Sequence, residues 1–181
     1  MRWILWIILA YLALTVQNVL GILVFIPASW PGDIRPDILA AAAVFVAFSA
    51  KNPLDVVIAC WLLGLGLDLT SGQGVVGPMP LAYSAAAYVV FRMRDAFFRD
   101  RLSSQIILTG VFALLAHVTW ITLQLVLALG AGHWESYGRM LIQACLLAVY
   151  SGLLAPVIFA LLGRCSRWLI TPAASRGSRE R

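Results

Sequence analysis

Long apolar stretches alternate with short polar segments along the chain. Six mainly apolar runs occupy residues 3–26, 38–50, 54–69, 75–91, 104–129 and 140–162. A helix needs about 20 apolar residues, within a range of about 17–25, to cross the hydrocarbon core of a bilayer. Four runs are long enough, whereas 38–50 and 54–69 are short. The pattern predicts an all-α integral membrane protein with six transmembrane helices, of which the second and third are short.

The basic residues predict the orientation of these helices. If both termini are cytoplasmic, eleven of the thirteen basic residues fall in cytoplasmic segments. These are Arg2, Lys51, Arg92, Arg94, Arg99, Arg101, Arg164, Arg167, Arg176, Arg179 and Arg181. Arg35 and Arg139 fall outside. Because cytoplasmic loops of membrane proteins carry an excess of Lys and Arg, we expect cytoplasmic termini and an even number of crossings.

One alternative also gives an even number of membrane crossings: residues 38–69 could form a re-entrant hairpin from the outer face. Lys51, in the turn between the two short runs, favours a cytoplasmic turn and therefore two full crossings. The first run is too long for a signal peptide, whose apolar region spans about 7–15 residues, so we expect an uncleaved first helix. Residues 1–170 would form a single transmembrane domain, and 171–181 a disordered basic tail.

Composition narrows the functional class. Of the 181 residues, 62% are hydrophobic and only 12% charged, whereas a soluble domain carries about 25% charged residues. The net charge of +5 follows from the cytoplasmic arginines, so nucleic acid is not an expected partner. The cysteines, Cys60, Cys145 and Cys165, form no metal or disulfide pattern. No G-x-S-x-G motif occurs, and we expect no catalytic, cofactor-binding or metal site.

Asp68 is the most informative polar residue. It lies in the third apolar run, where a carboxylate costs about 2.5–3.5 kcal/mol at the centre of a transmembrane helix. Gly64, Asp68 and Gly72 are spaced by four residues and share one helix face. The glycines would let another helix approach closely. We expect a polar contact at a helix junction, with partial hydration near the outer interface as the alternative.

Asp37 follows Pro36 at the start of the second run. A carboxylate is favourable at a helix N-terminus, so we expect Asp37 to cap that helix. A second hypothesis pairs Arg35 with Asp68, because both lie near the predicted outer face.

Two features of the last two runs have a structural and a functional interpretation. His117, in the fifth run, could form a proton relay with Gln124, but an interhelical hydrogen bond is the favoured interpretation. Ala144, Ala148 and Gly152 repeat every four residues in the sixth run. Small residues at this spacing allow close helix packing, or docking of a partner with a single transmembrane helix.

The order of these features resembles the bacterial rod shape-determining protein MreD family. The resemblance rests on Pro36-Asp37-Ile38-Leu39 before a short Ala/Val-rich run, a small basic turn, and Gly64-Leu-Gly-Leu-Asp68-Leu-Thr-Ser-Gly72. A glycine loop, a further run and the 92–101 arginine cluster follow, so the resemblance covers about residues 36–101. The turn after Gly72 is longer or shifted relative to the Gly-Pro-Leu-Gly-like turn common in the family.

The resemblance implies a non-enzymatic inner-membrane subunit of the bacterial cell-elongation complex, needed for rod shape and lateral peptidoglycan synthesis. Its main partner would be MreC, with MreB, RodA and a class B penicillin-binding protein associated through the complex, and membrane lipid around it. The implied functional motif comprises Pro36, Asp37, Gly64, Asp68 and Gly72. The family is also similar in fold to the vitamin-binding membrane subunits of energy-coupling-factor transporters, which gives the alternative function. Few polar residues are available for a vitamin pocket, which counts against it.

Overall fold

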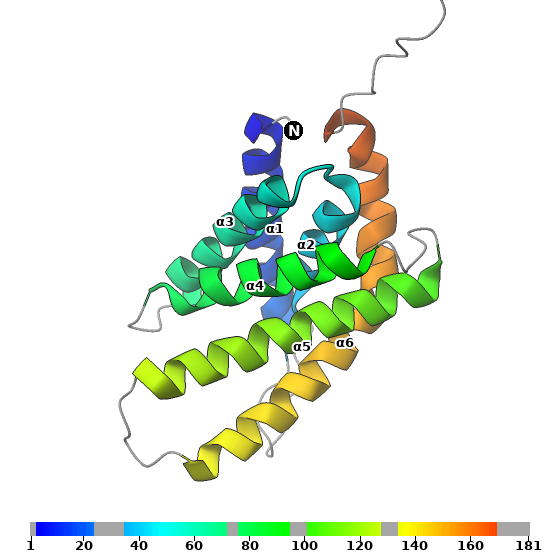
Figure 1. The fold of residues 1–181 in the computed structure, drawn as a ribbon. Helices are drawn as coiled ribbons and strands as arrows, with labels where there is room; N and C mark the ends of the chain where they lie inside the picture. The colour runs from blue at the N-terminus through cyan, green and yellow to red at the C-terminus, as the bar shows by residue number, and fades with distance from the viewer. Residues whose placement is uncertain (1–2, 24–34, 72–75, 95–100, 128–133, 170–181) are drawn as a thin grey trace, which may run out of the picture.

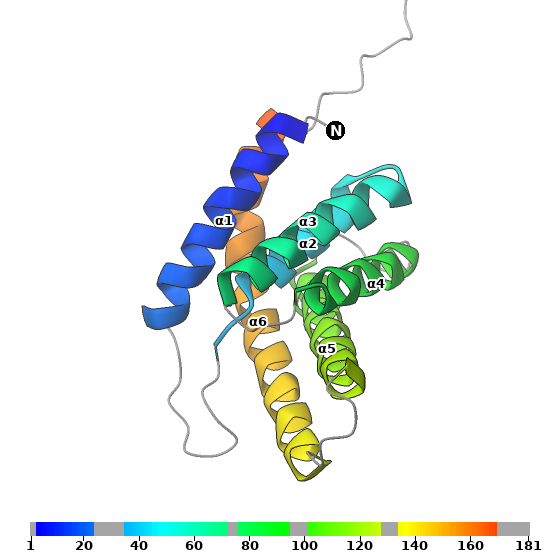
Figure 2. The ribbon, with the colours of Figure 1, turned by 90° about the vertical axis from the view of Figure 1, so that its left-hand side faces the viewer.

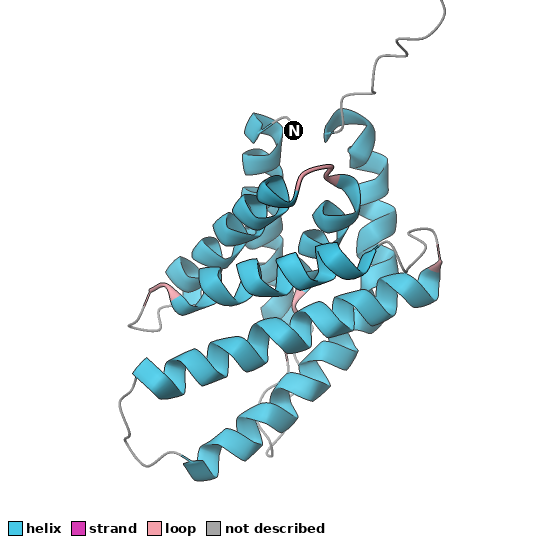
Figure 3. Ribbon diagram, in the orientation of Figure 1, coloured by secondary structure: helices cyan, strands magenta, loops and turns pink. Residues whose placement is uncertain are grey.

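The computed structural model describes residues 3–23, 35–71, 76–94, 101–127 and 134–169, and these residues form six α-helices and no strand. The helices are α1 (Trp3–Leu23), α2 (Ile38–Ser49), α3 (Pro53–Ser71), α4 (Pro78–Met93), α5 (Leu102–Leu127) and α6 (Trp134–Leu169). Figure 3 shows these helices with short loops between them. The all-α prediction is therefore confirmed. The predicted tail 171–181 lies outside the described residues.

The hydropathy of the described helices indicates a membrane protein. Three segments are long and apolar enough to cross a bilayer: Pro53–Thr70, Leu102–Leu127 and Tyr137–Arg164. Trp6–Val19 and Ile38–Ser49 are apolar but shorter. The third predicted run was expected to be short. It reaches membrane-spanning length because the helix begins at Pro53 and continues past Asp68 to Ser71.

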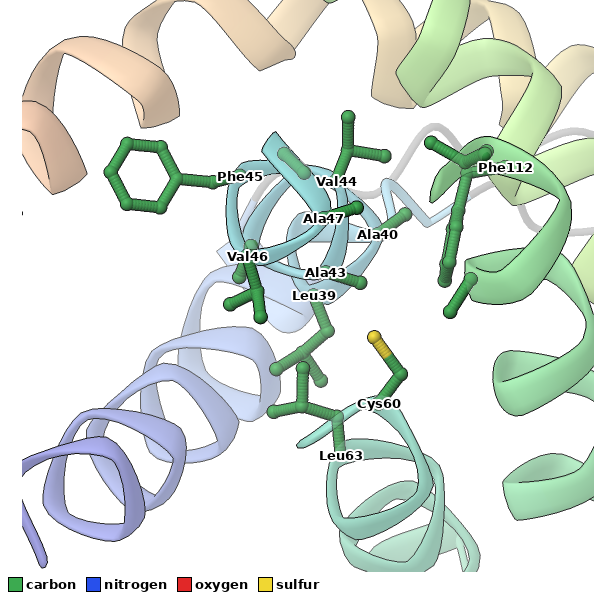
Figure 4. Packing of buried hydrophobic residues seen from close by; sticks show 14 of the residues in the cluster. Leu39, Ala40, Ala43, Val44, Phe45, Val46, Ala47, Cys60, Leu63 and Phe112 are labelled. Atoms are coloured by element: carbon green, nitrogen blue, oxygen red, sulfur yellow. The ribbon is translucent and has the colours of Figure 1, made fainter. Parts of the chain in front are cut away.

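Helix α2 lies at the centre of the fold. Every residue from Leu39 to Ala47 is buried, and α2 contacts each of the other five described helices. Figure 4 looks along α2 and shows its labelled side chains radiating on all sides, with Cys60 and Leu63 of α3 below and Phe112 beside them. Twelve residues rise only about 18 Å, less than the roughly 30 Å hydrocarbon core. A helix that is apolar all round is suited to this buried position.

The remaining helices enclose α2 in pairs. Helices α3 and α4 pack together, as do α5 and α6, while α1 contacts α2, α3 and α6. In Figure 1 the start of α1, the turn between α2 and α3, and the end of α6 lie at the top, and the start of α6 lies at the bottom. Figure 2 shows α1 on one side of α2 and α3, with α4 and α5 on the other.

Edge-to-face aromatic pairs join α2 to α6 and α4 to α5. The ring of Phe45 in α2 lies 5.5 Å from that of Phe159 in α6, at an interplanar angle of 77°. The ring of Tyr83 in α4 lies 5.1 Å from that of Phe112 in α5, at 84°. Such pairs contribute about 0.5–1.5 kcal/mol beyond their burial.

Candidate functional site

The N-terminus of α2 is built from a local sequence signal. Pro36 precedes Asp37, whose backbone is extended (φ −94°, ψ 91°), and the helix starts at Ile38. The Oδ1 atom of Asp37 accepts a hydrogen bond from the backbone N–H of Ala40 at 3.1 Å. Asp37 is buried, with 4% of its surface exposed. The capping role predicted for Asp37 is confirmed, although its depth in the protein was not predicted.

Side chains from two other helices bond further backbone groups at this end. Gln17 of α1 accepts from the backbone N–H of Ile38 at 2.8 Å and donates to the carbonyl of Pro36 at 3.0 Å. The Oγ atom of Ser151 in α6 accepts from the backbone N–H of Asp37 at 2.8 Å. The first N–H groups of a helix have no intrahelical acceptor. Buried in protein, they therefore need such partners.

A fourth side chain completes this polar cluster. The hydroxyl of Tyr83 in α4, itself fully buried, donates to Oδ2 of Asp37. We call Gln17, Asp37, Tyr83 and Ser151 the α2 cap cluster. It joins α1, α2, α4 and α6 around the N-terminus of α2. Both carboxylate oxygens have donors, and the positive end of the α2 dipole faces the group. These interactions offset the cost of removing a carboxylate from water.

Asp68 serves a second helix N-terminus in the same way. Its Oδ2 atom accepts from the backbone N–H of Gly77 at 2.7 Å and of Met79 at 3.3 Å. Gly77 has a positive φ of 129° and no side chain with which to cap α4. Asp68 of α3 supplies the missing acceptor and is 7% exposed. The contact at a helix junction is therefore the arrangement found, and Asp68 is buried.

Helices α3 and α4 approach each other closely at Gly64. A Cβ atom at Gly64 would lie 2.7 Å from Cα of Pro80 and 2.8 Å from the carbonyl oxygen of Met79. The close approach predicted from the Gly-x-x-x-Asp spacing is present. Gly72, the last residue of the predicted motif, lies outside the described residues.

Two polar expectations have different outcomes. Arg35 is exposed, while the hydrogen bonds given for Asp68 go to the start of α4, so their pairing stays a prediction. The interhelical hydrogen bond expected for His117 is wrong for its Nδ1 atom, which donates to the carbonyl of Ala113 at 2.9 Å within α5. The carbonyl of Ala113 lies one turn earlier in the same helix, so this hydrogen bond needs no partner helix.

Arg94 is a structural residue that the sequence did not single out. Its guanidinium donates to the carbonyls of Ala47 and Ala50 at 2.7 and 2.5 Å, at the C-terminus of α2, where a positive charge is favourable. It also lies 3.9 Å from the centre of the Phe91 ring. Because Tyr83 of α4 contacts the opposite end of α2, α4 and the residue that directly follows it bond both ends of the central helix.

The small residues of α6 form a tight contact with α5. A Cβ atom at Gly152 would lie 2.9 Å from the carbonyl oxygen of Ile106, and one at Gly110 would lie 3.5 Å from the carbonyl oxygen of Ala148. Ala144 and Ala148 are buried. The close-packing interpretation of this stripe is confirmed. An apolar groove runs beside the contact, lined by residues of both helices that include Ile107, Cys145 and Leu153.

The described residues contain no group of three or more His, Cys, Asp and Glu side chains placed to hold a metal ion. No protein-family model, no curated protein and no solved structure matches the chain.

Proposed function

We propose that this chain is a non-enzymatic membrane subunit of the bacterial cell-elongation complex, of the MreD kind. It would act by helix docking in the inner membrane, with MreC as its main partner and with MreB, RodA and a class B penicillin-binding protein reached through the complex. The observation that carries the proposal is the structural use of the motif on which the resemblance rests.

The described motif residues all serve to hold helices together. Pro36 and Asp37 set the N-terminus of the central helix, and Asp37 anchors it to α4 through Tyr83. Gly64 and Asp68 fix α3 against the start of α4. These polar residues engage backbone and side-chain groups of the same chain. A rigid helical framework of this kind is suited to presenting lipid-facing helices to membrane partners.

We further propose that the chain crosses the membrane six times with both termini in the cytoplasm. The start of α1, the turn between α2 and α3, and the end of α6 lie toward the same side of the molecule (Figure 1). Lys51 lies in that turn, and Arg94 reaches it from α4. A shared side for these basic groups agrees with the positive-inside rule. Because α2 is enclosed by protein, both of its ends can lie within the hydrocarbon core, short of the headgroups.

Cysteine labelling tests this topology. In a variant with its native cysteines replaced by alanine, Lys51→Cys should resist a membrane-impermeant maleimide added to intact spheroplasts and react after the membrane is opened. Arg35→Cys, exposed near the opposite end of α2, is the matched control and should react from outside. Reaction of Lys51→Cys from outside would contradict the orientation. Failure to react on either side would favour the re-entrant hairpin.

Depletion in the native bacterium tests the function. We expect rods to widen and round up in phase-contrast images as the protein is depleted, and to recover when the wild-type gene is restored. Vitamin uptake should stay normal, and MreC should copurify with the tagged protein in mild detergent. Unchanged cell shape together with reduced vitamin uptake would contradict the proposal and favour a transporter subunit.

A further inference from the structure

Helix α6 contains a proline near the place where it meets α2. It spans 36 residues and contains Pro156, and it changes direction along its length as it passes behind α5 (Figure 1). Proline has no N–H group, so the carbonyl of Gly152, four residues earlier, receives no hydrogen bond from residue 156. The proline ring also displaces that carbonyl. Sharp bends in helices arise at such positions.

The two parts of α6 pack against different helices. Before Pro156, the backbone of Gly152 lies against Ile106 and Gly110 of α5, so closely that an added Cβ would lie 2.9 Å from the Ile106 oxygen. After Pro156, the ring of Phe159 lies 5.5 Å from Phe45 and 6.3 Å from Phe48, both in or next to the buried length of α2. Close contacts with α5 therefore lie before Pro156, at Ala148 and Gly152, and the aromatic contacts with α2 lie after it, at Phe159.

A buried hydrogen bond joins the first part of α6 to the N-terminus of α2 beside the bend. Ser151, 1% exposed, accepts from the backbone N–H of Asp37 at 2.8 Å. It lies on the α5 side of Pro156, yet its partner is the capping residue of α2. Because this bond is short and excluded from water, it favours one angle between the two parts of α6.

We propose that Pro156 makes α6 a hinge, that residues 134–155 tilt together with α5 relative to α2, and that the Ser151–Asp37 hydrogen bond is the latch holding the observed angle. A force that tilts α5 and the first part of α6 would then change how these helices pack against α2. Helix pairs moving as units about a few hinge residues are a known form of conformational switching. This inference does not depend on the proposed function.

Distances between spin labels on the full-length protein in lipid nanodiscs test the hinge. One pair, Leu54→Cys and Ile142→Cys, joins the start of α3 to the α5-packed part of α6. A second pair, Leu54→Cys and Leu161→Cys, joins it to the α2-packed part. All three residues are exposed, and the native cysteines are replaced by alanine. Ile142 precedes Pro156 by 14 positions, a helical lever of about 21 Å, on which a rotation of about 10° moves the label by roughly 4 Å.

We expect Pro156→Ala to shift and narrow the first distance distribution by several ångströms, because it restores the helical hydrogen bond. Ser151→Ala should broaden the same distribution, because it removes the latch and keeps the hinge. The second pair should be unchanged in both variants, and Leu153→Ala, an exposed change in the same helix, should alter neither pair. If Ser151→Ala leaves the first distribution as narrow as in the wild type, the latch is wrong. If Pro156→Ala folds and also leaves it unchanged, the bend is rigid and the hinge is wrong.

Discussion

Replacing Asp37 by alanine should lower the free energy of unfolding by about 2–4 kcal/mol. The loss of a capping side chain costs about 1 kcal/mol. The same change leaves the fully buried hydroxyl of Tyr83 without its acceptor, and a buried donor without a partner costs about 1–3 kcal/mol more. Unfolding followed by far-ultraviolet circular dichroism, as mild detergent is exchanged for SDS, measures the difference from the wild type.

Two variants separate the contributions to this loss. Tyr83→Phe removes only the phenolic donor and should cost about 1 kcal/mol. In the double variant Asp37→Ala with Tyr83→Phe, the two losses should be less than additive, because both remove the same hydrogen bond. Asp55→Ala is the control, since Asp55 is a less buried acid in the first turn of α3 and should cost only a few tenths of a kcal/mol. If Asp37→Ala is as mild as this control, the cluster does not hold α2 in place.

The residues whose roles follow from local rules could be predicted from the sequence. A carboxylate directly after proline at the start of an apolar run is a capping signal, and Asp37 caps α2. The spacing of Gly64 and Asp68 predicts one helix face with a close neighbour, and both residues meet the start of α4. These predictions succeed because the partners lie within one helix turn or in the next helix along the chain.

The partners of Asp37 could not be predicted, because they lie far from it in sequence. Ser151 is 114 residues away and Tyr83 is 46 residues away. Each lies in an apolar run, where no local pattern predicts a hydrogen bond to a distant helix. Arg94 was assigned to orientation alone, since the positive-inside rule explains a cytoplasmic arginine without a specific acceptor. Its bonds to Ala47 and Ala50 depend on how α4 packs along α2.

The helix boundaries differ from the apolar runs for a related reason. Helix α6 starts at Trp134, before the predicted residue 140, because Glu135, Ser136 and Arg139 can continue a helix although they end an apolar run. Helix α4 starts at Pro78, after the predicted residue 75, because proline is favoured in the first helical turn and Gly77 adopts a positive φ before it. Hydropathy measures the apolar length, whereas caps and prolines determine where the helix begins.

Replacing Gly64 by alanine should lower the free energy of unfolding by about 3 kcal/mol, at the upper end of the range for overpacked cores. The added Cβ would meet the backbone of Met79 and Pro80 at 2.7–2.8 Å. Backbone atoms cannot rotate aside as a side chain can, so the first turn of α4 must move. That movement would lengthen the hydrogen bonds from Gly77 and Met79 to Asp68. The SDS-unfolding experiment used for Asp37 measures this loss.

Two other glycines make the comparison specific. Gly138→Ala in α6 adds a methyl group with nothing within 4 Å, so it should be neutral or stabilise the helix by up to about 1 kcal/mol. Gly66→Ala, on the same helix as Gly64, meets the flexible side chain of Leu14 and should cost less than Gly64→Ala. Equal stability of the Gly64 and Gly138 variants would show that α3 and α4 do not need this close approach. The expected order, with Gly64 the most sensitive, ties the cost to the backbone contact, because the same methyl group is added at each position.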